Sequence, residues 1–284
     1  MRGRSGSGAW CVADSVDGFW RRGDGTNLVG VPSGFVGSAD FNALDRPLHI
    51  AGVHEMNSGL FRLLEASSSA AEAEGIFAVY MAAMFGLAPR GANEEEKGAR
   101  RSYRSSYLRL LRGWAYDSNS PEGAVLKGWV ESRFGLYPTF HKAPLKRVSS
   151  EAWSRYIEEK MGSRFHNNAI YSQIDLLYEF AQWSLRRLYP DAKPLRVYRG
   201  VYDFDEHQMI ERIDKRRVIL RLNNLVSFTT DRHVAECFGD RILQTDVPLS
   251  KVVFFQNLIP KHALKGEDEV LVIGGDYLVS ASYY

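Results

Sequence analysis

The sequence is poor in cysteine and lacks a metal-binding pattern. Only two cysteines, Cys11 and Cys237, occur among 284 residues, and they form no CxxC pair. The seven histidines are scattered, without an HExxH-type helical pair. Two isolated thiols suit a reducing compartment and argue against a structural zinc site. We therefore expect no metal and a cytoplasmic location.

The sequence also lacks an excess of positive charge and a long hydrophobic run. Lys and Arg number 36 against 34 Asp and Glu, so the composition does not favour nucleic acid as a partner. The longest apolar helix candidate, residues 76–87, is too short to span a bilayer. The basic, Gly- and Ser-rich residues 1–8 precede no apolar segment of the signal-peptide type. We expect no integral membrane association.

Glycine-rich nucleotide motifs are absent as well. Neither GxGxxG nor GxxxxGK[ST] occurs, which leaves a Rossmann or P-loop site unsupported. What is present is typical of a globular protein, with 45% hydrophobic and 25% charged residues. The length allows one large domain or two ordinary ones.

The first two thirds of the chain have helical periodicity. Residues 1–26 are rich in Gly, Ser and Arg and predict a mobile N-terminal extension. Residues 27–50 predict a loop-rich, extended entry, and a helical half covers about 50–190. Ser120 before Pro121 is a favourable helix start. The expected helices are 70–85, 103–114, one starting at 121, 149–161 and 168–189.

After Pro194 the pattern changes to the two-residue period of strands, and about 191–284 forms a β-rich half. Two short helices, 205–215 and 232–238, are expected between the strands. Helices first and strands later predict an α+β fold, with the helical half packed on a mixed or antiparallel β core. The expected strands are 195–201, 217–222, 225–229, 242–247, 252–256, 270–273 and 277–282.

An acidic triplet opens one apolar strand candidate. Glu267 and Glu269 share one face of an extended chain, about 7 Å apart, while Asp268 points to the other. Two carboxylates so placed cannot both ionise cheaply once water is excluded. The alternative is a solvated acidic guard at a sheet edge.

Two other strand candidates carry a polar residue near one end. Arg199 follows Leu195 and Val197 on one face, and Ser227 shares a face with Leu225. Such groups are costly on a half-apolar face unless they satisfy one another or a ligand. Taken alone, Arg199 could pair with a neighbouring carboxylate or lie in solvent. Ser227 could simply be a strand residue without a functional role.

The three groups occur in a known order. Together they resemble the motifs of the R-S-E class of mono-ADP-ribosyltransferases, whose arginine-specific members carry Glu-x-Glu. The three motifs here are Tyr198-Arg199-Gly200, Ser227-Phe228-Thr229 and Glu267-Asp268-Glu269. Residues 107–115, 122–135 and 263–269 are similar to the dinitrogenase reductase ADP-ribosyltransferases of nitrogen-fixing bacteria. The resemblance runs from about residue 27 to the C-terminus and implies one ADP-ribosyltransferase domain over 27–284.

The resemblance implies catalytic roles for the four charged or hydroxyl residues Glu269, Glu267, Arg199 and Ser227. Glu269 would bind the nicotinamide-ribose 2′-hydroxyl of NAD and stabilise the oxocarbenium-like transition state. Glu267 would hold the incoming arginine, and the alternative for this residue alone is a solvated loop acid. Arg199 would bind the NAD phosphates or ribose, and Ser227 would orient Glu269.

Four further positions match NAD-binding positions of the class. Gly200 would let the backbone approach the nicotinamide amide. Asn224 would contact NAD, and Thr229 keeps a hydroxyl where the class often has a second serine. Phe238 would cover the nicotinamide, although Val234 and Phe238, four residues apart, could both be core.

The implied reaction is transfer of ADP-ribose from NAD to an arginine of dinitrogenase reductase, which releases nicotinamide and inactivates nitrogenase. The alternatives are another arginine-bearing protein, water as acceptor in an NAD glycohydrolase, or a non-catalytic regulatory module that binds NAD or a PII-type nitrogen-signalling protein. A run of basic residues has two explanations, a solvated helix face or a docking surface for an acidic protein. It comprises Arg100, Arg101, Arg104, Arg109 and Arg112.

Overall fold

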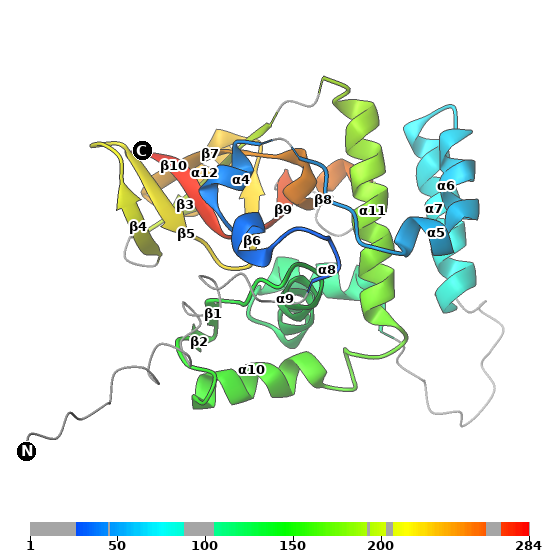
Figure 1. Ribbon diagram of the computed structural model, residues 1–284, viewed down its shortest axis with the longest axis horizontal. Coiled ribbons are helices and arrows are strands. Elements are labelled where there is room, and N and C mark those ends of the chain that lie inside the picture. The colour runs from blue at the N-terminus through cyan, green and yellow to red at the C-terminus, as the bar shows by residue number, and fades with distance from the viewer. Residues whose placement is uncertain are drawn as a thin grey trace, which may run out of the picture.

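The computed structural model describes residues 27–44, 46–87, 105–191, 194–202, 207–259 and 268–283. Its helices lie mostly in the N-terminal two thirds and its strands in the last third, as the α+β prediction requires (Figure 1). The helices are α3 Ser33–Val36, α4 Ala39–Asn42, α5 Val53–Met56, α6 Ser58–Glu65, α7 Ala70–Phe85, α8 Tyr107–Tyr116, α9 Pro121–Phe134, α10 Glu151–Met161, α11 Ile170–Leu188 and α12 Arg232–Glu236.

Serine caps decide where several helices begin. The hydroxyls of Ser69, Ser106, Ser120 and Ser150 each accept a hydrogen bond from the backbone N–H three residues later. Each bond satisfies an N–H that the helix itself leaves without a partner. These caps explain why α7 and α9 begin where the sequence predicts.

Within the described residues, eight strands form one antiparallel sheet in the order β4-β5-β10-β7-β3-β6-β9-β8. They are β3 Leu195–Val201, β4 Gln208–Arg212, β5 Arg217–Arg221, β6 Leu225–Thr229, β7 Arg241–Val247, β8 Val252–Phe255, β9 Glu269–Ile273 and β10 Asp276–Tyr283. A short hairpin, β1 Phe140–His141 and β2 Ala143–Pro144, and two 3₁₀ turns, Leu249–Lys251 and Gln256–Leu258, complete the described elements.

The sheet is weakly joined at its middle. Strands β3 and β7 share seven residue pairs and β6 and β9 share five, whereas β3 and β6 share only Tyr198 with Thr229. The backbone hydrogen bonds that normally hold neighbouring strands are therefore few at this one seam.

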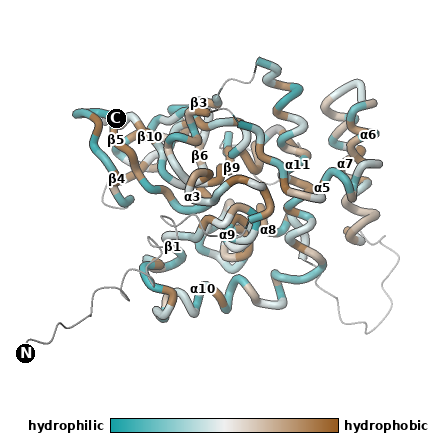
Figure 2. Tube along the Cα trace, viewed as in Figure 1, coloured by the Kyte–Doolittle hydropathy of each residue, from teal (hydrophilic) through white to brown (hydrophobic). Residues whose placement is uncertain are grey.

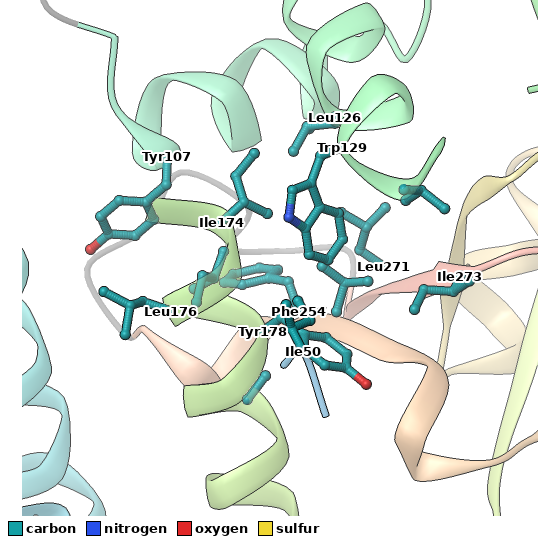
Figure 3. Packing of buried hydrophobic residues seen from close by; sticks show 14 of the residues in the cluster. Ile50, Tyr107, Leu126, Trp129, Ile174, Leu176, Tyr178, Phe254, Leu271 and Ile273 are labelled. Atoms are coloured by element: carbon teal, nitrogen blue, oxygen red, sulfur yellow. The ribbon is translucent and has the colours of Figure 1, made fainter. Parts of the chain in front are cut away.

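The two faces of the sheet pack into different hydrophobic clusters. On one face of β9, Leu271 and Ile273 pack in the cluster of the helical half with Trp129 and Tyr178 (Figure 3). On the other face, Val270 and Val272 pack in a second cluster formed mainly by the strands. Both faces of β9 are buried, which explains its unbroken apolar sequence. Helix α9, coloured largely white and brown in Figure 2, is buried along most of its length against this face.

Two local predictions are wrong. Residues 208–212 form strand β4 instead of part of a helix, because they pair with β5 at the sheet edge, and this non-local pairing outweighs a weak helical pattern. The entry at 27–50 is not only extended, since it contains α3 and α4. No helix among the described residues is long and apolar enough to cross a membrane.

Candidate active site

Ser227 and Glu269 meet across two neighbouring strands. Thr229 pairs with Glu269 and Ser227 with Leu271, so the side chains of Ser227 and Glu269 lie on the same sheet face. The Ser227 hydroxyl donates to Oε1 of Glu269 over 2.5 Å. Glu269 is only 6% exposed. The buried carboxylate is therefore held at the first residue of β9 by a hydrogen bond from β6.

A tryptophan from the helical half contacts the same serine. Trp114 of α8 donates from Nε1 to the Ser227 oxygen over 2.8 Å, and its side chain is buried. Trp114 is not among the site residues expected from the sequence. Its only sequence indication is its position within the segment 107–115 that resembles the family, since the contact joins residues 113 positions apart.

Arg199 reaches the seam from β3. Its Nη1 donates to the backbone carbonyl oxygen of Ser227 over 2.8 Å. The register places Tyr198, not Arg199, on the same face as Thr229 and Ser227. The arginine thus contacts the backbone of β6 instead of the Ser227 hydroxyl.

His207 is a second residue near the site that no sequence motif indicates. Burial, and then the positive charge of Arg199, lower the pKa of His207 to about 4. Its buried Nε2 has no hydrogen-bond partner among the described residues. The imidazole beside Arg199 is therefore neutral at physiological pH.

Gly200 has a structural reason to lack a side chain. A Cβ at this position would lie 2.2 Å from the Ala235 carbonyl oxygen, which is far below a van der Waals contact. Helix α12 therefore packs directly on the β3 backbone. Phe238 follows that helix and is 50% exposed. The alternative that Phe238 belongs to the core is wrong.

Asn224 and Thr229 are both buried. The Asn224 amide donates to the carbonyl oxygens of Lys127 and Leu136, at 2.9 and 2.8 Å. Its amide protons are thus used to join the start of β6 to α9 and the segment that follows. Thr229 accepts a hydrogen bond from the Asp231 N–H and pairs with Glu269. Contact of either residue with NAD stays a prediction.

Two sets of predictions lie partly or wholly outside the described residues. Glu267 is outside them, as are Arg100, Arg101 and Arg104 of the basic run. Arg109 is half-buried, 3.8 Å from Glu122 and stacked over the Phe165 ring, whereas Arg112 is exposed. Arg109 is therefore not part of a fully solvated face.

Among the described residues, one group could offer three metal ligands together: His49, His54 and Glu179. Oε2 of Glu179 lies 2.9 Å from Nδ1 of His49 and 2.8 Å from Nε2 of His54, and Oε1 accepts the Ile50 N–H over 2.7 Å. Arg186 lies 3.2 Å from the other His49 nitrogen, which makes that nitrogen an acceptor and Nδ1 a donor. Hydrogen bonds thus account for this buried carboxylate, and it joins residues 49–54 to α11.

The site has a glutamate at a strand start, a serine that bonds to it and an arginine on the adjacent strand, in the order typical of R-S-E transferases. A sequence model described as dinitrogenase reductase ADP-ribosyltransferase (DRAT) matches residues 26–281. The chain therefore belongs to the dinitrogenase reductase ADP-ribosyltransferase family, and the resemblance found in the sequence is confirmed.

A curated relative supports the same assignment. The chain is 59% identical over 264 residues to the NAD(+)–dinitrogen-reductase ADP-D-ribosyltransferase of Rhodospirillum rubrum, which covers 92% of this chain and 96% of that protein. No solved structure matches the chain significantly.

Proposed function

We propose that this protein transfers ADP-ribose from NAD to an arginine side chain of dinitrogenase reductase, releases nicotinamide and thereby inactivates nitrogenase. Membership of the family and the printed activity of the Rhodospirillum rubrum relative support this function. The structural observation that carries it is the buried Glu269 carboxylate, held by the Ser227 hydroxyl at the first residue of β9.

Glu269 stabilises the departure of nicotinamide. The bond between the ribose C1′ and the pyridinium nitrogen breaks, and its electron pair leaves with neutral nicotinamide. Positive charge then develops on the ribose. A fixed carboxylate stabilises that charge more than the ground state, and its burial strengthens the interaction because little water screens it.

Arg199 and its neighbours bind the dinucleotide. The planar guanidinium carries five N–H donors, and its Nη1 donates to the Ser227 carbonyl oxygen. A charged planar group of this kind suits the NAD diphosphate or ribose. Gly200 belongs to β3, Asn224 immediately precedes β6, and the half-exposed Phe238 supplies an aromatic surface for the nicotinamide.

Glu267 holds the acceptor. Arginine is a poor nucleophile because its guanidinium keeps its proton, so a carboxylate must orient it and take up a proton as the new bond to C1′ forms. NAD serves as co-substrate in this scheme, and no step requires a metal. An ADP-ribosyltransferase core, a cytoplasmic location and a PII-type regulatory partner remain predictions.

The test is incubation of the full chain with labelled NAD and ADP-bound dinitrogenase reductase, followed by mass spectrometry of the reductase. We expect one ADP-ribosylated arginine. Glu269→Gln should lower the rate by at least about 100-fold, the size of effect seen when one transition-state contact is removed. Asp268→Asn is the matched control, because it removes an exposed charge one residue away.

Two results would contradict the proposal. An unmodified reductase, with nicotinamide released only by hydrolysis of NAD, would favour the glycohydrolase alternative. NAD binding without nicotinamide release under any condition would favour the non-catalytic module.

A further inference from the structure

The hydrogen bonds at Ser227 have only one consistent direction. An indole N–H is a donor only, and a serine hydroxyl has one proton and two lone pairs. Since Trp114 occupies a lone pair of the Ser227 oxygen, the hydroxyl proton is available for the acceptor 2.5 Å away, Oε1 of Glu269. Trp114 thus determines which way the hydroxyl points.

We propose that Trp114 is a positioning residue for ADP-ribosyl transfer. Its N–H fixes the Ser227 hydroxyl, and the hydroxyl in turn fixes the rotation of the Glu269 carboxylate. The inference rests on the catalytic role proposed above for Glu269. It extends the active site into the helical half of the chain, because Trp114 belongs to α8.

The surroundings of Trp114 hold the indole firmly. Its side chain is 4% exposed, and the Lys127 ammonium lies 5.9 Å from its ring centroid. Lys127 is itself held by hydrogen bonds to the Asn119 side chain and the Phe140 carbonyl oxygen, both 3.1 Å. Since α8 packs along α9, which carries Lys127, the indole has little freedom to rotate.

A simpler explanation is that the buried indole merely needs an acceptor, as buried tryptophans usually do. Trp183 is a suitable comparison for that case. Its Nε1 donates over 2.7 Å to Glu65, and its side chain is 5% exposed. Both tryptophans lose the same N–H and keep an aromatic ring when they are replaced by phenylalanine.

The experiment compares Trp114→Phe with Trp183→Phe in the full chain, with nicotinamide release and reductase modification measured separately. We expect Trp114→Phe to lower kcat for both reactions about 10- to 100-fold and to leave KM for NAD within about twofold, because orientation is lost and ground-state binding is kept. Trp183→Phe should leave kcat within about twofold, even if it lowers the melting temperature as much as Trp114→Phe does.

A double-mutant cycle with Ser227→Ala separates positioning from general stability. If Trp114 acts through the serine, Trp114→Phe should have almost no further effect on kcat once Ser227 is alanine. Additive losses would overturn the proposal. If Trp114→Phe does not fold, benzothienylalanine at position 114 keeps the ring shape, replaces the N–H by sulfur and gives the same comparison.

The outcomes distinguish this inference from the proposed function. Unchanged kcat in Trp114→Phe, with Glu269→Gln inactive, would overturn the role of Trp114 and leave the active site in place. Full activity of Glu269→Gln would overturn both. A selective loss of kcat in Trp114→Phe, absent from Trp183→Phe, would support it.

Discussion

Arg199 on β3 donates a hydrogen bond of 2.8 Å to the backbone carbonyl oxygen of Ser227 on β6. The two strands pair only at Tyr198 and Thr229. If the register continued, Gly200 would face Ser227, so the Arg199 side chain spans a place where backbone pairing has ended. Arg199 therefore joins the two parts of the sheet, in addition to any contact with NAD.

The first prediction concerns Arg199→Lys. Lysine keeps the charge but has one ammonium in place of a planar fork, so it cannot bind the Ser227 carbonyl and a diphosphate in the same geometry. We expect KM for NAD to rise about 10-fold and the free energy of unfolding to fall by about 1 kcal/mol. Steady-state kinetics and urea denaturation measure the two effects.

Arg196→Lys is the matched control, because Arg196 lies on the same strand in an exposed ion pair with Asp246. Exposed pairs contribute little to stability, so neither quantity should change appreciably. An equal rise in KM for both variants would contradict a specific role for Arg199.

The second prediction concerns Gly200→Ala. The new methyl group would lie 2.2 Å from the Ala235 carbonyl oxygen, so α12 must move away from β3. We expect the free energy of unfolding to fall by about 1–3 kcal/mol, which is typical of overpacking, and kcat/KM for NAD to fall as Phe238 moves with the helix. Thermal denaturation and nicotinamide release test the two effects.

Gly59→Ala provides the contrast. Outside the backbone of its own helix, no described residue places an atom within 4 Å of a Cβ on Gly59 in α6, so alanine should be neutral or stabilise the protein by about 0.5–1 kcal/mol. A destabilisation as large as that of Gly200→Ala would show that the close approach of α12 is not the cause.

The sequence predicted those elements that local rules determine. Strands β3 and β6 have the predicted limits because alternation and the flanking breaks define them, and α7 begins at a serine cap. Strand β4 was predicted as a helix because its identity depends on pairing with β5. Local periodicity carries no information about such a partner.

The same distinction applies to the site. The shared face of Ser227 and Glu269 follows from alternation on two strands that were both predicted, although their adjacency was not. Trp114 could not be predicted, because its bond to Ser227 depends on how α8 packs against the sheet. The hydrogen bonds of Asn224 could not be predicted either, because their acceptors are backbone carbonyl oxygens of α9 and the segment that follows it.

The third prediction concerns a lysine outside the site. Lys251 is fully buried, and its Nζ has no hydrogen-bond partner among the described residues. Its Nζ lies 4.9 Å from the Tyr277 ring centroid and 5.3 Å from that of Phe41. Burial lowers the pKa of Lys251 from 10.5 to about 7, with Asp276 acting in the opposite direction.

This shift makes stability depend on pH in a definite direction. Between pH 7 and 10.5 the unfolded chain keeps the Lys251 proton that the folded chain has lost, so the free energy of unfolding rises with pH. Lys251→Met should therefore stabilise the protein at pH 7 by about 1–3 kcal/mol, and the gain should shrink as pH approaches 10. Urea denaturation at pH 7, 8.5 and 10 measures the difference, with the exposed Lys146→Met as control. A gain that does not change with pH would show that methionine stabilises only by packing, and that the Lys251 amine titrates normally in the fold.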